Sequence, residues 1–125
     1  MSLDSDIFRL VKQLTWETVE GGVEWRLRDP PRSITAGTLD LIPIYIECRY
    51  EGRQTIGVYE RRYRHYIDED SYYWNAMIVL VLLDNEGRVI YESRESDILI
   101  NNLFDVARDR ASNLTGVLGA LLKKP

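Results

Sequence analysis

Apolar side chains recur at every second position through much of the middle of the chain. Ile42, Ile44 and Ile46 show this spacing, and the run from 76 to 83 is apolar at every position. A period of two places alternate side chains on one face of a β-strand. A short strand that is apolar throughout is typical of the centre of a sheet covered on both faces. The pattern therefore predicts an antiparallel meander across this region.

Two turns determine the expected register of this meander. The sequence indicates a two-residue turn at 51–52 and a four-residue turn at 68–71. With these turns, odd-numbered positions of the strand between them share a face with even-numbered positions of both neighbours. A slip of one residue would invert every side chain of a strand, so the assignment of faces depends on this parity. The expected inward face holds Ile42, Ile44, Ile46, Cys48, Tyr59, Tyr63, His65, Trp74, Ala76, Ile78, Leu80 and Leu82.

Helical spacing appears toward both ends of the chain. Apolar positions from Ile7 to Leu14 lie three and four residues apart, which predicts a helix ending near Val19. The same spacing from Ile100 to Ala111 predicts a second helix, and a shorter one is expected to begin at Asn113 or Thr115. Alternating stretches at 23–28 and 88–93 add short strands, whereas 32–38 is expected to be irregular and exposed.

These elements predict one fold class. The 125 residues, 45% hydrophobic and 29% charged, fit a single domain spanning 1–125 with a sizeable core. We expect an α+β fold in which a four- or five-stranded antiparallel β-meander packs against an N-terminal helix and one or two C-terminal helices.

Composition narrows the expected surroundings of the protein. A formal net charge of -4 disfavours a surface built to hold nucleic acid, although a local basic patch would still allow it. The single cysteine, Cys48, excludes an intrachain disulfide and favours a reducing compartment. Acidic residues stand where a secretion signal would be basic, and the longest apolar run is too short to span a bilayer. We expect a cytoplasmic protein with no membrane partner.

The outward face of the predicted sheet supplies a candidate binding surface. By the expected register it carries Arg62, Arg64, Tyr66, Tyr73 and Asn75. Guanidinium groups bind phosphate or carboxylate, and tyrosine rings stack on planar groups, so this face could take an anionic ligand or single-stranded nucleic acid. The alternative interpretation is a solvated sheet face whose arginines are neutralised by neighbouring glutamates.

Apolar side chains on the same outward face suggest an interface. Tyr45, Val58, Met77 and Val79 are too apolar to face water without a cover. Either the N-terminal helix and the C-terminal helices take opposite faces of the sheet, or a second copy of the chain covers the exposed face as a homodimer.

Catalytic and metal-binding patterns are missing from the sequence. His65 is the sole histidine and has no predicted nucleophile or acid beside it, while Cys48 falls on the inward face. The acidic groups of 68–70 and 84–86 lie at opposite ends of one predicted strand and do not match a calcium loop. We therefore expect no catalytic residue, metal or cofactor.

Two structural signals resemble small uncharacterised bacterial proteins of helix, meander, helix order. One is a Leu-Thr pair before a strand beginning Gly-x-x-x-Trp, from Gly21 to Trp25. The other is the ladder Leu103, Ala107, Ala111, Leu114 and Leu118. The resemblance covers roughly a third of the chain and implies no known activity.

Together these patterns favour a non-enzymatic protein-interaction module. We expect it to bind itself or another protein through a sheet face or its long hairpin. The alternative is a binder of an anionic ligand or single-stranded nucleic acid through the Arg/Tyr-rich face.

Overall fold

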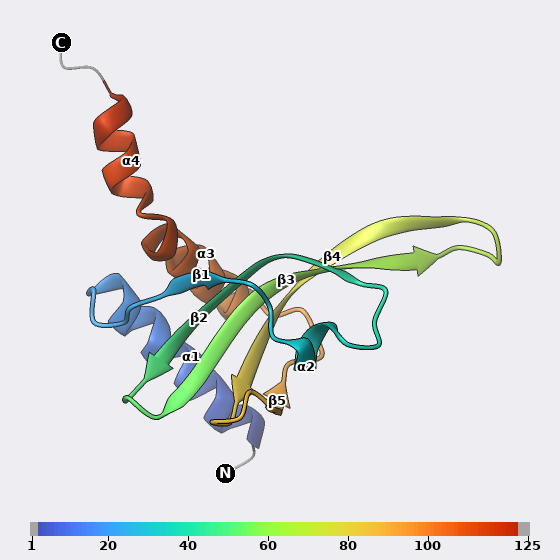
Figure 1. The fold of residues 1–125 in the computed structure, drawn as a ribbon, viewed down its shortest axis with the longest axis horizontal. Coiled ribbons are helices and arrows are strands. Elements are labelled where there is room, and N and C mark those ends of the chain that lie inside the picture. Colours follow the sequence, from blue (N-terminus) through green and yellow to red (C-terminus); the bar gives the residue numbers. More distant parts are fainter. Residues whose placement is uncertain (1–2, 123–125) are drawn as a thin grey trace.

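The computed structural model describes residues 3–122 and has the expected α+β fold, with five antiparallel strands in the order β1-β2-β3-β4-β5. Figure 1 shows helices α1 and α3 on one side of the sheet, and the short helix α2 lies on the other. The elements are α1 (Leu3–Val19), β1 (Arg26–Arg28), α2 (Arg32–Thr35), β2 (Leu41–Tyr50), β3 (Gln54–Tyr66), β4 (Tyr72–Leu83), β5 (Val89–Glu92), α3 (Ile98–Ser112) and α4 (Leu114–Leu121).

The main core lies between the sheet and the pair of helices α1 and α3. Leu14 of α1 and Leu103 of α3 are fully buried against Ile46, Val58 and Leu80 of the three central strands. The spacing that predicted both helices places their apolar stripes on this core, so the expected packing of α1 and α3 on the sheet is confirmed. Both helices lie on the same face, so the alternative that placed them on opposite faces is wrong.

A buried polar contact joins α1 to the segment before β1. The indole Nε1 of Trp25 donates a hydrogen bond to Thr18 Oγ1 at 2.9 Å, and Thr18 Oγ1 donates to the carbonyl of Leu14 at 2.6 Å. Both side chains are buried, and these bonds satisfy their polar atoms without water. The contact holds the chain between helix and sheet after the break at Gly21, whose φ is 84°.

A second apolar cluster occupies the opposite face of the sheet. Its buried members are Tyr45, Tyr59, Met77, Val79, Val81 and Leu83. Residues 32–35 form α2, so the expectation of an irregular segment is wrong there, although Arg32 and Ser33 are exposed as predicted. Ile34 of α2 is half-buried and packs against this cluster. A Cβ at Gly57 would lie 2.8 Å from Tyr45 Oη and 2.9 Å from Val81 Cγ1. Glycine there lets the tyrosine ring lie against β3.

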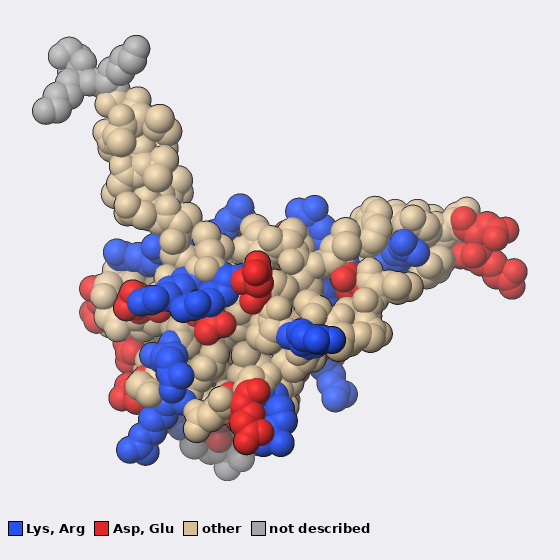
Figure 2. All heavy atoms as spheres, viewed as in Figure 1, with Lys and Arg blue, Asp and Glu red and all other residues tan. Residues whose placement is uncertain are grey.

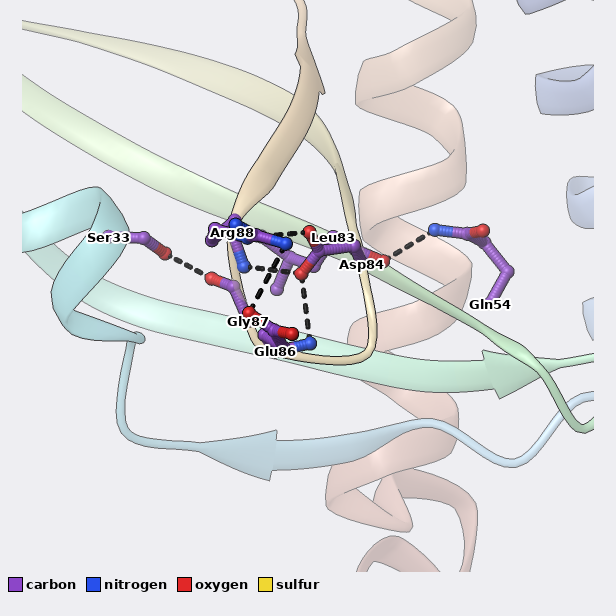
Figure 3. A network of polar contacts seen from close by, with 7 residues as sticks. All are labelled: Ser33, Gln54, Leu83, Asp84, Glu86, Gly87 and Arg88. Carbon is purple, nitrogen blue, oxygen red and sulfur yellow. Dashed lines mark hydrogen bonds and ion pairs between the residues drawn. The ribbon is translucent and has the colours of Figure 1, made fainter.

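Hydrogen bonds at the β4–β5 turn hold α2 over this second cluster (Figure 3). Ser33 Oγ donates to the carbonyl of Gly87 at 2.6 Å, which ties α2 to the turn. Within the turn, Asp84 Oδ1 accepts the backbone N–H groups of Arg88 and Glu86, each at 2.9 Å. These donors, that of Arg88 first, lower the pKa of the Asp84 carboxyl.

The turn between β2 and β3 is one residue longer than the sequence suggested. Tyr50 pairs with Gln54 instead of Arg53, leaving Glu51, Gly52 and Arg53 in the loop. Glu51 and Gly52 both have positive φ, at 55° and 69°. Such a conformation is uncommon for glutamate, so the residue types do not reveal the longer loop.

The turn between β3 and β4 is also one residue longer than the sequence suggested. Tyr66 opposes Tyr72, so the expected pairing of Ile67 with Tyr72 is wrong by one residue. The Asp68 carboxylate closes this loop by accepting the N–H groups of Asp70 and Ser71 at 2.9 and 2.8 Å. An aspartate carboxylate that accepts backbone N–H groups can stabilise a longer turn that contains no glycine.

Because both turns are one residue longer than predicted, the side chains of β3 point to the opposite face from the one expected. Those of β2 and β4 still share a face with one another. Ile46 of β2 and Leu80 of β4 share the main core, as predicted. In β3, however, the even-numbered Val58 joins that core, whereas the odd-numbered Tyr59 and Tyr63 lie on the α2 side. The predicted parity of β3 is therefore wrong, and its side chains exchange faces.

The first predicted inward residue of β2 is also on the other face. A register shift between Leu41 and Ile44 places Ile42 against the α2-side cluster and not in the main core.

Replacement of Trp74 and of Leu80 by alanine should separate the hairpin end from the core. Trp74, which the sequence places inward, is 45% exposed, so Trp74→Ala should lower the free energy of unfolding by about 1 kcal/mol or less. Leu80 is fully buried, so Leu80→Ala should cost about 2–5 kcal/mol. Guanidinium unfolding followed by far-UV circular dichroism measures both, and equal losses would contradict the structure.

Candidate interaction surface

The outer halves of β3 and β4 form a two-stranded arm that extends beyond the helices (Figure 1). We define the arm as residues 62–76. Every residue from 64 to 76 is exposed, whereas Met77 and the positions that follow return to the two cores. The arm is therefore the part of the sheet that neither helix layer covers.

One face of the arm carries a stack of aromatic and guanidinium groups, which we call the ladder face: Arg62, Arg64, Tyr66, Tyr72 and Trp74. The Arg64 guanidinium carbon lies 4.9 Å from the Tyr72 ring centroid and 5.4 Å from that of Trp74. Tyr66 and Tyr72 have centroids 5.5 Å apart, and Tyr72 meets Trp74 edge-on at 5.9 Å. Cation–π and edge-to-face contacts of this kind order exposed side chains.

The opposite face of the arm carries the rest of the predicted binding set. Tyr73 packs against His65 with centroids 4.9 Å apart, and Asn75 opposes Tyr63 across the strands. Because β3 is inverted, Arg62, Arg64 and Tyr66 share the ladder face, while Tyr73 and Asn75 lie behind it. The five predicted residues thus do not form one surface, and Tyr72 and Trp74 complete the ladder face instead. Side chains two residues apart on a strand share a face, and this spacing of Tyr72 and Trp74 is the sequence signal that could have identified them as a pair.

Charge is divided along the arm. Figure 2 shows acidic side chains gathered at its tip and basic side chains nearer the body. The tip acids are Asp68, Glu69 and Asp70. The backbone N–H groups of Asp70 and Ser71 lower the pKa of the Asp68 carboxyl because they donate hydrogen bonds to its charged form.

The two arginines of the ladder face have different partners. Arg62 Nε lies 3.0 Å from Glu60 Oε2. Across residues 3–122, no carboxylate comes within 4.0 Å of the Arg64 guanidinium, which is instead held by its rings. The planar face of Arg64 is thus occupied, while its charge has no anionic partner.

The base of the arm is fixed to the body by Arg61. Its side chain reaches Asp40 Oδ2 at 3.7 Å and Glu92 Oε1 at 3.9 Å, bridging the segment before β2 and strand β5. Tyr59 Oη donates to the other oxygen of Glu92 at 3.2 Å. The arm therefore begins from an ordered, partly buried network.

The four predicted interface residues are buried by the chain itself. Tyr45, Met77 and Val79 lie in the α2-side cluster with exposed fractions of 1%, 8% and 0%. Val58 is fully buried in the main core because of the inversion of β3. The uncovered apolar sheet face that suggested an interface at these positions is absent from the described structure.

Helix α4 is a second exposed apolar element. Figure 1 shows it projecting from the end of α3, where Asn113 adopts the left-handed conformation at φ 52°. It contributes no buried residue, and its apolar side chains are 41–71% exposed. The expected terminal helix is present, but its apolar stripe does not reach the core.

Residues considered for chemistry do not assemble into a reactive centre. Cys48 is buried, and burial followed by the charge of Glu47 raises its thiol pKa to about 12. His65 lies on the exposed arm, not on the predicted inward face. Within residues 3–122 no group of three or more His, Cys, Asp or Glu side chains could hold a metal ion. No helix in that range is both long and apolar enough to cross a bilayer.

A hollow lies between the start of α1, strand β5 and the start of α3. Asp97 and Glu92 contribute to its lining. The Asp97 carboxylate already accepts the N–H groups of Leu99 and Ile100, and Glu92 already binds Tyr59 and Arg61. Both carboxylates are thus engaged in holding the fold.

Comparison of the chain with protein-family models, with curated proteins and with solved structures found no match. The surface of the molecule is therefore the basis for a functional proposal.

Cys48 should be unreactive in the folded protein. At pH 8 an unfolded cysteine is partly thiolate, since its pKa is about 8.5, whereas the folded thiol stays protonated and inaccessible. A disulfide reagent such as DTNB should label it slowly in buffer and rapidly in 6 M guanidinium, roughly a hundredfold faster or more. Rapid labelling of the native protein would place Cys48 at the surface.

Proposed function

We propose that this chain is a non-enzymatic interaction module that self-associates through the ladder face of its arm. The observation that carries the proposal is the exposure of three neighbouring rings, with Tyr66 at 56%, Tyr72 at 43% and Trp74 at 45%. Tyrosine, tryptophan and arginine are the residues most enriched where protein contacts are strongest. A contiguous exposed apolar patch of a few hundred Å² is often a functional contact site.

The ordering of the ladder face favours binding. Arg64 is already stacked on Tyr72 and Trp74, so less side-chain entropy is lost when a partner covers them. An aromatic side chain buries roughly 150–250 Å² in full, and about half of each ring is still exposed. The three rings thus offer on the order of 300 Å² per copy, which suits a weak, concentration-dependent contact.

The arm is a better contact than the sheet faces of the body. The apolar side chains on both faces of the inner sheet are buried, on one face under α1 and α3 and on the other in a cluster against which Ile34 of α2 packs. A second copy therefore gains more by covering the arm than by displacing either layer. As part of the same proposal we place this module in the bacterial cytoplasm, with no cofactor and no membrane partner.

A second candidate function is the binding of an anionic ligand or single-stranded nucleic acid. The ladder face supports it because Arg64 has no carboxylate within 4.0 Å across residues 3–122 and lies beside rings on which bases could stack. The acidic tip and the net charge of -4 oppose it, since both repel a polyanion. We rank it second for that reason.

Self-association should disappear when the ladder rings are removed. Sedimentation velocity from about 5 to 500 µM, a range suited to a weak interface, should show the average mass rising toward a dimer. Tyr72→Ser with Trp74→Ser should hold the protein at monomer mass, because the apolar contact is lost while the core is untouched. A constant monomer mass for the unmodified protein would refute the proposal.

Two matched variants locate the contact. Trp16→Ser removes a tryptophan that is 67% exposed on α1, and it should leave the mass curve unchanged. Leu118→Glu with Leu121→Glu makes α4 polar and should also leave it unchanged. If the α4 variant alone became monomeric, the contact would belong to that helix and not to the arm.

Nucleic-acid binding should be weak or absent. A fluorescent single-stranded oligonucleotide titrated with protein at low salt should show no saturable anisotropy change, because the acidic tip lies beside the arginines. Saturable binding that weakens steeply with salt and is lost in Arg62→Ala with Arg64→Ala would instead support the second candidate.

A further inference from the structure

Along the arm, the order of charges and rings on the ladder face determines in which orientation a second copy of the chain could pair with it. From tip to base it presents the acids 68–70, then Tyr66 opposite Tyr72, then Arg64 opposite Trp74, and then Arg62. Acidic, aromatic and basic zones therefore follow one another along a single strand pair. Such an order is complementary to itself when it is reversed.

The spacing of the zones is nearly symmetric about the Tyr66–Tyr72 pair. Glu69 lies three residues beyond Tyr66, while Arg64 and Arg62 lie two and four residues before it. With a rise of about 3.4 Å per residue along β3, Arg64 and Arg62 lie roughly 7–14 Å before this pair, and the acids of the turn after Tyr66 lie within about 10 Å beyond it. A two-fold axis through the rings would bring each acidic tip opposite the arginines of the other copy.

We infer that the arm binds a second copy of itself in antiparallel orientation, with Glu69 and Asp70 of each chain facing Arg62 and Arg64 of the other. This arrangement rests on the proposed self-association and specifies its geometry. The rings of Tyr66 and Tyr72 pack against their counterparts at the centre, and at each end the acidic tip of one copy faces the arginines and Trp74 of the other. An interface of this kind is isologous and closes at the dimer.

The charges are free to pair in this way. No cation lies within 4.0 Å of the Glu69 or Asp70 carboxylates in the part of the chain that the structure describes. Arg64 likewise lacks a carboxylate partner within that part. Arg62 is bound to Glu60 but is 51% exposed, so it can face a second carboxylate. The antiparallel pair supplies each group with the opposite charge.

A parallel pair would have the opposite electrostatics. Both acidic tips would then meet, placing six carboxylates together, and both arginine zones would meet at the base. Like charges brought into contact oppose association and exclude the wrong orientation. The charge order therefore favours the antiparallel arrangement and excludes the parallel one.

Charge reversal in the full-length chain tests this geometry. The stem variant carries Arg62→Glu with Arg64→Glu, and the tip variant carries Glu69→Lys with Asp70→Lys. Asp68 is left in place because its carboxylate holds the turn through two backbone N–H groups. A control variant, Arg28→Glu with Arg53→Glu, changes the net charge by the same amount as the stem variant at exposed positions outside the arm.

Each variant alone should self-associate at least about tenfold more weakly than the unmodified protein, because like charges then meet at both ends. An equimolar mixture of stem and tip variants should recover dimer formation to within about threefold, since one end is native and the other is fully reversed. Sedimentation velocity of a fluorescent stem variant titrated with unlabelled tip variant measures the mixed dimer.

The control distinguishes specific pairing from a general effect of net charge. A mixture of the control variant with the tip variant should not recover the affinity, because the control variant has no reversed stem. Circular dichroism and unfolding midpoints of all variants should match the unmodified protein, which confirms that they fold.

The outcomes separate this inference from the proposal beneath it. If the unmodified protein stays monomeric at every concentration, self-association itself fails. If it dimerises but mixing restores nothing, the antiparallel geometry is overturned while self-association stands. If the tip variant binds the unmodified protein more tightly than the unmodified protein binds itself, opposite charges meet at the tips and the arms pair tip to tip.

Discussion

The pairing of β3 with β4 is the interaction on which the rest of the structure depends. Its register runs without a break from Thr55 opposite Leu83 to Tyr66 opposite Tyr72. The inner half contributes Val58 and Leu80 to the core under α1 and α3, while its other face is covered by α2. The outer half continues with the same alternation beyond these layers. The rings of Tyr66, Tyr72 and Trp74 are therefore exposed and form part of the ladder face of the arm.

Much of the fold could be predicted because several signals were independent. Helical spacing located α1 and α3, and alternation assigned β4, and β2 from Ile44 onward, to the correct faces. The parity of β3 could not be predicted because it depends on both turn lengths. Glu51 in a left-handed conformation and Asp68 as a turn acceptor each add a loop position that residue types alone do not require. The two differences compensate, so the neighbours of β3 gave no sign of the inversion.

The candidate surface was predicted only in part, and for the same reason. Arg62, Arg64 and Tyr66 do share a face, because they alternate within a single strand. Their expected companions came from β4, and the inverted register moved Tyr73 to the opposite side. Trp74 has the predicted orientation, but the sequence does not show where the helices stop covering the sheet. That limit is a property of tertiary packing, since it depends on the lengths and positions of α1 and α3 relative to the strands.

Cross-strand nuclear Overhauser effects in isotopically labelled protein measure the β3–β4 register most directly. Opposed residues of antiparallel strands lie about 4.5–5.5 Å apart at Cα, close enough for their backbone protons to give strong contacts. The account predicts contacts that link Val58 with Leu80 and Tyr66 with Tyr72. A pattern shifted by one residue, linking Tyr59 with Leu80 and Ile67 with Tyr72, would return Tyr59 to the main core, dismantle the ladder face and contradict the account.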